Sequence, residues 1–300
     1  MAHSHPHHHK SHSGKILITI LLNIAITVAQ VIGGLWSGSL ALLSDALHNF
    51  TDVVSLIISY VASLFASKEA SKERTFGYKR AEILAAFVNA CSLIVIAVIL
   101  IVEAVERFFS PQDIESNLVI ILSFIAILGN GFSVLLLKSD SKRNMNTKSA
   151  YLHLFTDMLA SVAVLIGGLL MKFYAIFWID SVLTLAIAIY LVVVSIDLLK
   201  QSYRVLMLFT PKNINVEDIA NRIKTLNGVS NLHHIHLWQL NEDEVHLEAH
   251  LSFEQDFKIS EFDEILIEIE VFLKDQYNIN HVNIQPEYNR KDSKDIIVQD

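Results

Sequence analysis

The sequence predicts an α-helical membrane protein with six transmembrane helices, followed by a C-terminal α+β cytosolic domain. The first reason is composition. Of 300 residues, 52% are hydrophobic and only 18% are charged, whereas roughly a quarter of the residues in a soluble domain are charged. The second reason is that charge is unevenly placed. Residues 1–199 contain 13 Lys and Arg and 13 Asp and Glu, whereas residues 200–300 contain 10 and 18 and so carry the whole net charge of −8.

The same numbers exclude several classes of protein. A disordered chain is disfavoured by the low polar content, and a nucleic-acid binder by the negative net charge. The chain has one cysteine, Cys91. A disulfide framework, or a zinc site built on several thiolates, is therefore excluded.

Six apolar runs have the length of about 20 residues that crosses the hydrocarbon core of a bilayer. They occupy residues 16–35, 40–65, 83–102, 118–137, 150–171 and 177–196. The first run could be a cleaved signal peptide, but it is long, lacks a clear small-residue cleavage site and is closely followed by the second run. We expect it to be retained, so that residues 16–199 form a six-helix transmembrane domain.

Lys and Arg in the connections predict the orientation. Eleven of them precede the first run or lie between the second and third runs and between the fourth and fifth runs. Only Arg107 and Lys172 lie on the other side. The positive-inside rule therefore places both termini in the cytoplasm.

Residues 204–288 have the pattern of a small soluble domain. We expect a helix over 216–226, a β-hairpin of strands 233–239 and 245–253, a second helix from an N-cap at Ser260 to residue 276, and a third strand over 281–285. The order αββαβ predicts one layer of helices on a sheet. Residues 289–300 are expected to form a flexible tail.

Polar residues interrupt two of the apolar runs. Asp45, His48 and Asp52 lie in the second run, and His153 and Asp157 lie in the fifth. An Asp at the centre of a membrane helix costs roughly 2.5–3.5 kcal/mol, so these groups need partners. Residues four apart share a helix face, so each His-x-x-x-Asp presents an imidazole and a carboxylate together. Two such helices facing each other would form a tetrahedral site suited to zinc.

The alternative is that these groups only form hydrogen bonds between helices. The recurrence of the spacing on a second helix favours a metal site, because the apolar runs contain no other histidine. Asp45 lies three residues before His48. We expect it to support the ligands or to line the access path, with direct ligation as the alternative.

Three segments carry a resemblance to a known family: LSDALHNFTD at residues 43–52, TFGYKRAEIL at residues 75–84 and HLFTD at residues 153–157. Together they resemble the cation diffusion facilitator family, and the resemblance extends from the first span to Glu287. It implies six transmembrane helices, a copper-chaperone-like cytosolic domain, a homodimer, and exchange of a cytosolic divalent metal ion for protons. It also implies that the transported ion binds His48, Asp52, His153 and Asp157.

The two histidines in this set resemble the zinc branch, whose members often also handle cadmium or cobalt. Some members have a second metal site in the loop between the second and third spans. Here residues 67–74 read SKEASKER, without histidine or aspartate, and we expect no metal there. The loop between the fourth and fifth spans lacks the histidine-rich insert common in eukaryotic relatives, which favours a bacterial plasma membrane.

Six histidines lie in the tail domain, and part of this pattern is ordinary strand alternation with a polar outer face. Residues 232–238 and 284–287 nevertheless resemble family segments that bring metal ligands together. The matching positions are His233, His250, His281 and Glu287. His234 stands where relatives often have Asp.

Six more histidines lie within residues 1–15. They could belong to a purification tag, but the longest run is three, and we favour a flexible cytosolic metal collector.

These features predict a proton-coupled exporter that moves Zn²⁺ out of the cytosol by alternating access, with no enzymatic activity. The expected transported ion is Zn²⁺, with Cd²⁺ or Co²⁺ as further candidates, and protons move in exchange. The other expected partners are the bilayer and a second copy of the chain, and no nucleic acid is expected. One alternative is a membrane-bound metal sensor that uses the tail domain without transport. An intramembrane metalloenzyme is less favoured, because a motif such as His-Glu-x-x-His is absent.

Overall fold

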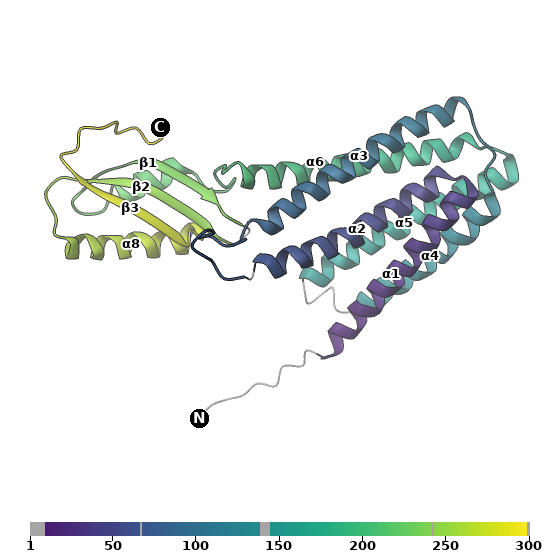
Figure 1. Ribbon diagram of the computed structural model, residues 1–300, viewed down its shortest axis with the longest axis horizontal. Coiled ribbons are helices and arrows are strands. Elements are labelled where there is room, and N and C mark those ends of the chain that lie inside the picture. Colours follow the sequence, from purple (N-terminus) through teal and green to yellow (C-terminus); the bar gives the residue numbers. More distant parts are fainter. Residues whose placement is uncertain (1–9, 67, 139–144, 242, 299–300) are drawn as a thin grey trace. The chain divides into compact units, whose positions relative to one another are not determined.

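The computed structural model describes residues 10–66, 68–138, 145–241 and 243–298. The chain divides into two compact units. The first comprises Met1–Ile58 and Val88–Leu198, and the second comprises Ser59–Phe87 and Leu199–Asp300. The first unit holds most of the long helices, and the second holds a small α+β domain together with the connection between the second and third helices (Figure 1). The histidine-rich residues 1–9 lie outside the described residues.

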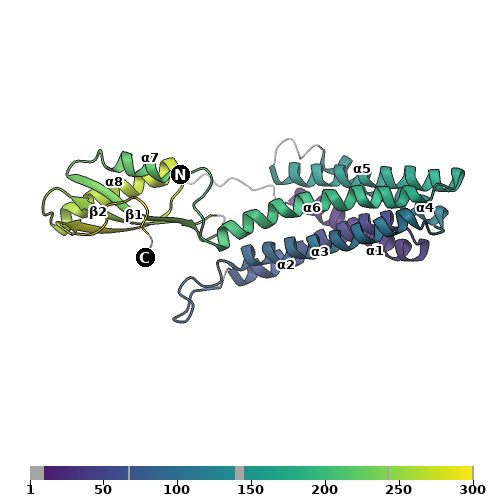
Figure 2. The same ribbon diagram turned by 90° about the horizontal axis from the view of Figure 1, so that it is seen from above.

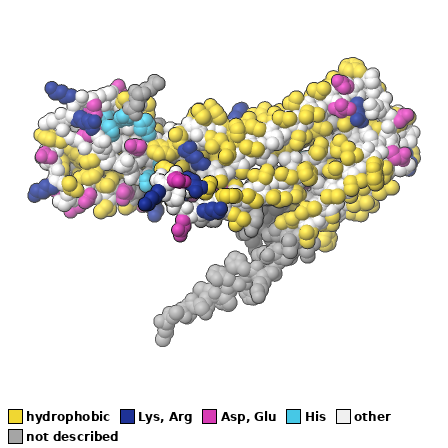
Figure 3. All heavy atoms as spheres, in the orientation of Figure 1, with side chains coloured by type: hydrophobic (Ala, Val, Ile, Leu, Met, Phe, Trp, Pro, Cys, Tyr) yellow, Lys and Arg dark blue, Asp and Glu magenta, His cyan; other side chains and the backbone are white. Residues whose placement is uncertain are grey.

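Six long helices match the six apolar runs. They are α1 (Lys10–Ser37), α2 (Leu40–Ala66), α3 (Ala81–Phe109), α4 (Ser116–Leu137), α5 (Met145–Tyr174) and α6 (Trp178–Leu206). Among the described residues, five helices are long and apolar enough to cross a membrane: α1, α3, α4, α5 and α6. The 27-residue helix α2 is not among these five. The side chains of several of its residues lie outside the described part of the chain. Hydrophobic side chains cover much of the helical surface, as expected for contact with lipid (Figure 3).

A tight connection holds the first two helices together. Gly38 has a φ of 74°, a conformation that favours glycine. Gly34 lies so close to α2 that a Cβ atom at this position would be 3.1 Å from the Cα, Cβ and backbone nitrogen of Leu43. Because lipid provides no hydrophobic drive between helices, such close contact contributes to their association.

Asp180 of α6 caps the start of α2. It is 1% exposed. Its Oδ2 accepts a hydrogen bond from the backbone N–H of Leu40 at 2.7 Å, and its Oδ1 accepts bonds from the Ser39 hydroxyl at 2.5 Å and the Ala41 N–H at 3.3 Å. A carboxylate at this place satisfies N–H groups that have no partner within the helix and suits the positive end of the helix dipole. The beginning of α2 is thereby fixed to α6.

The α+β domain contains α7 (Val216–Ile223), β1 (Val229–Gln239), β2 (Val245–Phe253), α8 (Ile259–Tyr277) and β3 (His281–Tyr288). The sheet order is β1-β2-β3, with β1 antiparallel and β3 parallel to β2. Both helices cover one face of the sheet (Figure 2). The core between the layers includes the buried residues Ile219, Leu232, Leu247, Leu251, Ile269 and Leu273. The element order is the one that the sequence predicts.

Two details differ from the prediction. The N-cap of α8 is Lys258 rather than Ser260, which lies inside the helix. The expectation was wrong because Glu261, three residues after Lys258, accepts the Lys258 backbone N–H at 2.9 Å and so starts the helix earlier. The second detail concerns residues 289–298, for which the sequence predicts a flexible tail. This segment lies along β1, where the N–H groups of His234 and Ile235 donate to the carbonyl groups of Asp295 and Ile296 at 3.1 and 2.8 Å.

Candidate metal sites

The first candidate site lies between α2 and α5. His48 Nε2 is 3.9 Å from Asp157 Oδ1, and His153 Nε2 is 3.6 Å from Asp157 Oδ2. The two imidazole rings are 6.0 Å apart, centroid to centroid, and nearly perpendicular. Asp157 is 2% exposed. Asp52 lies one turn after His48 on α2, but its side chain lies outside the described residues.

These distances suit a small tetrahedral ion. Zinc binds imidazole nitrogen and carboxylate oxygen at about 2.0–2.2 Å, which places ligand atoms about 3.3–3.6 Å from one another. The separations of Asp157 from the two imidazoles, 3.9 Å to His48 and 3.6 Å to His153, are within a few tenths of an ångström of that value. Three of the four predicted ligands are thus brought together. Tyr190 of α6 lies beside them, with its ring centroid 6.4 Å from that of His48. No spacing in the sequence pointed to this tyrosine.

Asp45 has different neighbours. Its Oδ2 accepts hydrogen bonds from Gln30 Nε2 at 2.7 Å and from Ser161 Oγ at 3.1 Å. Gln30 in turn accepts a bond of 3.4 Å from Asn49. Asp45 is 1% exposed. This network links α1, α2 and α5, and it gives Asp45 a supporting position rather than a place among the imidazoles.

The second candidate site lies at the edge of the small domain. Its members are His233 of β1, His250 of β2, Glu287 of β3 and Asp292, and each offers one ligand atom within 4.8 Å of the other three. Strand pairing explains the convergence, because His233 lies directly opposite His250 in the antiparallel pair. Glu287 Oε1 is 2.9 Å from His250 Nδ1, and Glu287 Oε2 is 3.3 Å from His233 Nε2. Histidine side chains gather on this domain in Figure 3.

A lysine ammonium group stands among these ligand atoms. Lys294 Nζ is 3.0 Å from Glu287 Oε2 and 3.2 Å from His233 Nε2, and it also pairs with Asp292. Burial acts to lower the pKa of Lys294, but its hydrogen bonds to Asp292 and Glu287 outweigh this effect and raise that pKa overall. Burial lowers the pKa of His233 below its ordinary 6.5, and the charge of Lys294 adds to the shift. This shift favours the neutral form of His233, which is the form that binds metal.

His281 does not join this group. It begins β3 and pairs with His246 of β2, and the two ring centroids are 4.3 Å apart. His281 and Glu287 are six residues apart on one strand, a distance of about 20 Å. They cannot both reach one ion. The structure places Asp292 beside the other three residues, and the sequence reasoning missed it because residues 289–300 were expected to form a flexible tail.

Comparison with known proteins adds the family context. The chain matches the cation efflux transmembrane domain over residues 16–207 and the cytoplasmic domain of cation efflux proteins over residues 211–289. It is 35% identical to a cadmium, cobalt and zinc/H(+)-K(+) antiporter of Bacillus subtilis, over 94% of this chain and 91% of that protein. It is 34% identical to the metal cation efflux system protein CzcD of Cupriavidus metallidurans, over 95% and 90% of the two chains. It is 36% identical to the zinc transporter ZitB of Pectobacterium atrosepticum, over 97% and 91%.

Proposed function

The chain belongs to the cation efflux family, which its transmembrane motifs resemble, and we propose that it exports Zn²⁺ from the cytosol in exchange for protons. The family and the relatives are metal transporters rather than enzymes, and this chain is an integral membrane protein of that kind. The observation that carries the proposal is the convergence of His48, His153 and Asp157 between two membrane helices.

The ligand chemistry favours zinc as the substrate. Two imidazoles and a carboxylate suit a borderline-soft ion, and Asp52 would complete a tetrahedral set. Manganese and magnesium prefer sites richer in oxygen. The names of the relatives support cadmium and cobalt as further substrates.

Proton coupling follows from the same imidazoles. Zinc binds only neutral imidazole, and free imidazole has a pKa of about 6.5, so metal and protons compete at His48 and His153. In an alternating-access cycle, zinc leaves on the outer side, protons reload the histidines or carboxylates there, and the empty carrier returns inward. Protonation also lowers the cost of carrying carboxylates through the membrane interior.

The arrangement in the cell completes the proposal. Six spans would lie in a bacterial plasma membrane with both termini in the cytoplasm, and the tail domain, of copper-chaperone-like fold, would pair two copies of the chain. His233, His250, Glu287 and Asp292 would bind a second zinc ion, which requires Lys294 to leave its present partners. Residues 1–15 remain a predicted metal collector that transport does not require.

The experiment is zinc flux into vesicles that contain the purified full chain, with internal pH recorded at the same time. We expect a proton gradient to drive zinc in the opposite direction. Zinc movement without opposing proton movement, and without dependence on the pH difference, would refute antiport. A protein that binds zinc but moves none would favour the sensor function instead.

A further inference from the structure

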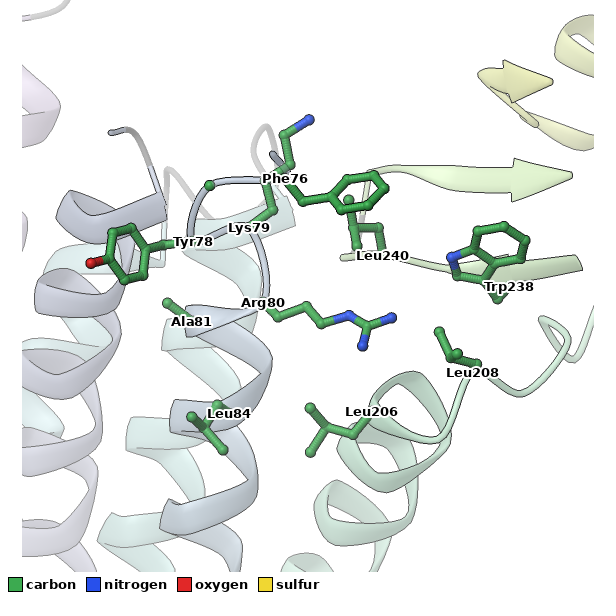
Figure 4. A pocket seen from close by; sticks show the side chains of 11 residues that line it. Phe76, Tyr78, Lys79, Arg80, Ala81, Leu84, Leu206, Leu208, Trp238 and Leu240 are labelled. Atoms are coloured by element: carbon green, nitrogen blue, oxygen red, sulfur yellow. The ribbon is translucent and has the colours of Figure 1, made fainter. Parts of the chain in front are cut away.

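A cavity of about 580 Å³ lies within the second unit, lined by residues of the connection before α3, the start of α3, the end of α6 and the end of β1 (Figure 4). Its wall is mostly apolar and includes Leu84, Leu206, Leu208 and Trp238. Leu84 and Leu208 are about half exposed, at 54% and 49%. A cavity of this size falls in the range of small-molecule sites.

The cavity lies at the ends of two membrane helices. Leu84 belongs to the first turn of α3, and Leu206 is the last residue of α6, both among the candidate spans. Leu84 and Leu206 thus belong to segments that are apolar enough to contact lipid tails. The connection before α3 carries five of the Lys and Arg residues that predict the cytoplasmic side.

Arg80 brings charge into this apolar space. In Figure 4 its guanidinium group points toward the space between Leu206, Leu208 and Trp238. Its Nε atom is buried and has no hydrogen-bond partner among the described residues, and no described carboxylate lies within ion-pair distance of it. The neighbouring Lys79 differs, because its Nζ is 2.7 Å from a carboxylate oxygen of Glu244. A buried guanidinium donor without a partner is costly, and a phosphate group accepts its hydrogen bonds in a favourable geometry.

We propose that this cavity binds an anionic phospholipid of the cytosolic leaflet, with its phosphate on Arg80 and an acyl chain against Leu84 and Leu206. The mixed wall argues for this occupant: an apolar lining alone would suit any lipid tail, whereas the unpaired Nε–H donor of the positively charged Arg80 favours a negative headgroup. Anionic headgroups concentrate at cytosolic membrane surfaces and are attracted by basic residues there. The proposal does not depend on zinc transport.

Trp238 provides a probe inside the cavity. Trp36→Phe and Trp178→Phe together leave it as the one tryptophan of the chain. Its fluorescence is measured in vesicles of phosphatidylcholine that contain a second lipid brominated near the top of its acyl chains. The brominated lipid is phosphatidylglycerol in one preparation and phosphatidylcholine in the other. We expect the brominated phosphatidylglycerol to quench Trp238 at a several-fold lower mole fraction. One basic residue at a membrane surface contributes about five-fold to such an association, so Arg80→Gln should remove about that preference.

Two further variants sharpen the test. Lys72→Gln removes the same charge from the same connection but lies outside the cavity lining, and it should keep the preference. Leu84→Glu adds a carboxylate one helical turn from Arg80, and it should abolish the preference while Arg80 is retained.

Equal quenching by both lipids in the parent, or an unchanged preference in Arg80→Gln, would overturn the proposal. Absence of quenching by either lipid would also overturn it.

Discussion

Three buried carboxylates of the helical unit should respond differently when each is changed to its amide. Asp157 faces two imidazoles, Asp45 accepts hydrogen bonds from an amide and a hydroxyl group, and Asp180 caps α2. Asn keeps the shape and one oxygen of Asp, so the main change is the loss of one negative charge. The expected order of loss in zinc affinity is Asp157→Asn, then Asp45→Asn, then Asp180→Asn.

The sizes of these effects follow from the geometry. Two unit charges 4 Å apart interact by about 4 kcal/mol where the effective dielectric constant is about 20. A divalent ion bound directly to Asp157 would lose at least this much, nearly three orders of magnitude in affinity. Asp45 would act through the ligands that it supports, where losses of about 10–100-fold are usual. Asp180 binds the N–H of Leu40, which lies eight residues before His48, about 12 Å along α2, so its change should weaken the cap of α2 with little effect on zinc.

The assay is zinc titration of the detergent-purified full chain against a competing chelator dye. The tail site is silenced in every sample by His250→Ala, and circular dichroism and size-exclusion chromatography verify folding. Zinc flux in vesicles should follow the same order. An Asp157→Asn protein that binds zinc within tenfold of its parent would refute the ligand assignment. A larger loss in Asp45→Asn than in Asp157→Asn would make Asp45 the direct ligand.

Three further predictions concern other parts of the chain. Lys294→Met removes a competing cation from the tail site, so in an Asp157→Asn background it should raise the zinc affinity of that site about five-fold. His281→Ala should leave this affinity unchanged. A lower zinc affinity in Lys294→Met would contradict competition between Lys294 and zinc. Burial and the charge of His281 lower the pKa of His246 below 6.5, so the unfolded state binds more protons and stability falls as pH drops below about 6.5. Protection factors of β2 amides at pH 5.5 and 7.5 measure this loss, which His246→Gln should remove. Gly34→Ala should lower the melting temperature, because the backbone of α2 must move, whereas Gly131→Ala, with its nearest neighbour at 3.5 Å, should not.

Periodicity explains why much of the arrangement could be predicted from the sequence. The spacing of four residues in His48 to Asp52 and His153 to Asp157 is a property of one helix, and alternation in strands is equally local. The place of Asp292 is not local. It depends on hydrogen bonds between residues 295–296 and β1, which no periodic pattern announces. The separation of His281 from Glu287, by contrast, was available from strand geometry alone, since six residues of extended chain span about 20 Å.

Residues that never touch the ion should influence which ion is chosen. A metal site requires its ligands to be held within about 0.5 Å of the productive geometry. Here α2 is fixed at its start by Asp180 and one turn before His48 by the bonds of Asp45 to Gln30 and Ser161. Ser161→Ala would remove one of these bonds without changing charge, which allows the site to expand.

We expect this variant to transport cadmium, the larger ion, better relative to zinc than the parent does, before total flux falls. Thr156→Ala is a control, because Thr156 is an exposed residue of the same helix and, within the described part of the chain, its hydroxyl donates only to the Leu152 carbonyl of its own preceding turn. Cadmium and zinc flux measured in the same vesicles gives the ratio directly. An unchanged ratio in Ser161→Ala, with both fluxes reduced equally, would show that the bond to Asp45 stabilises the fold without setting the size of the site.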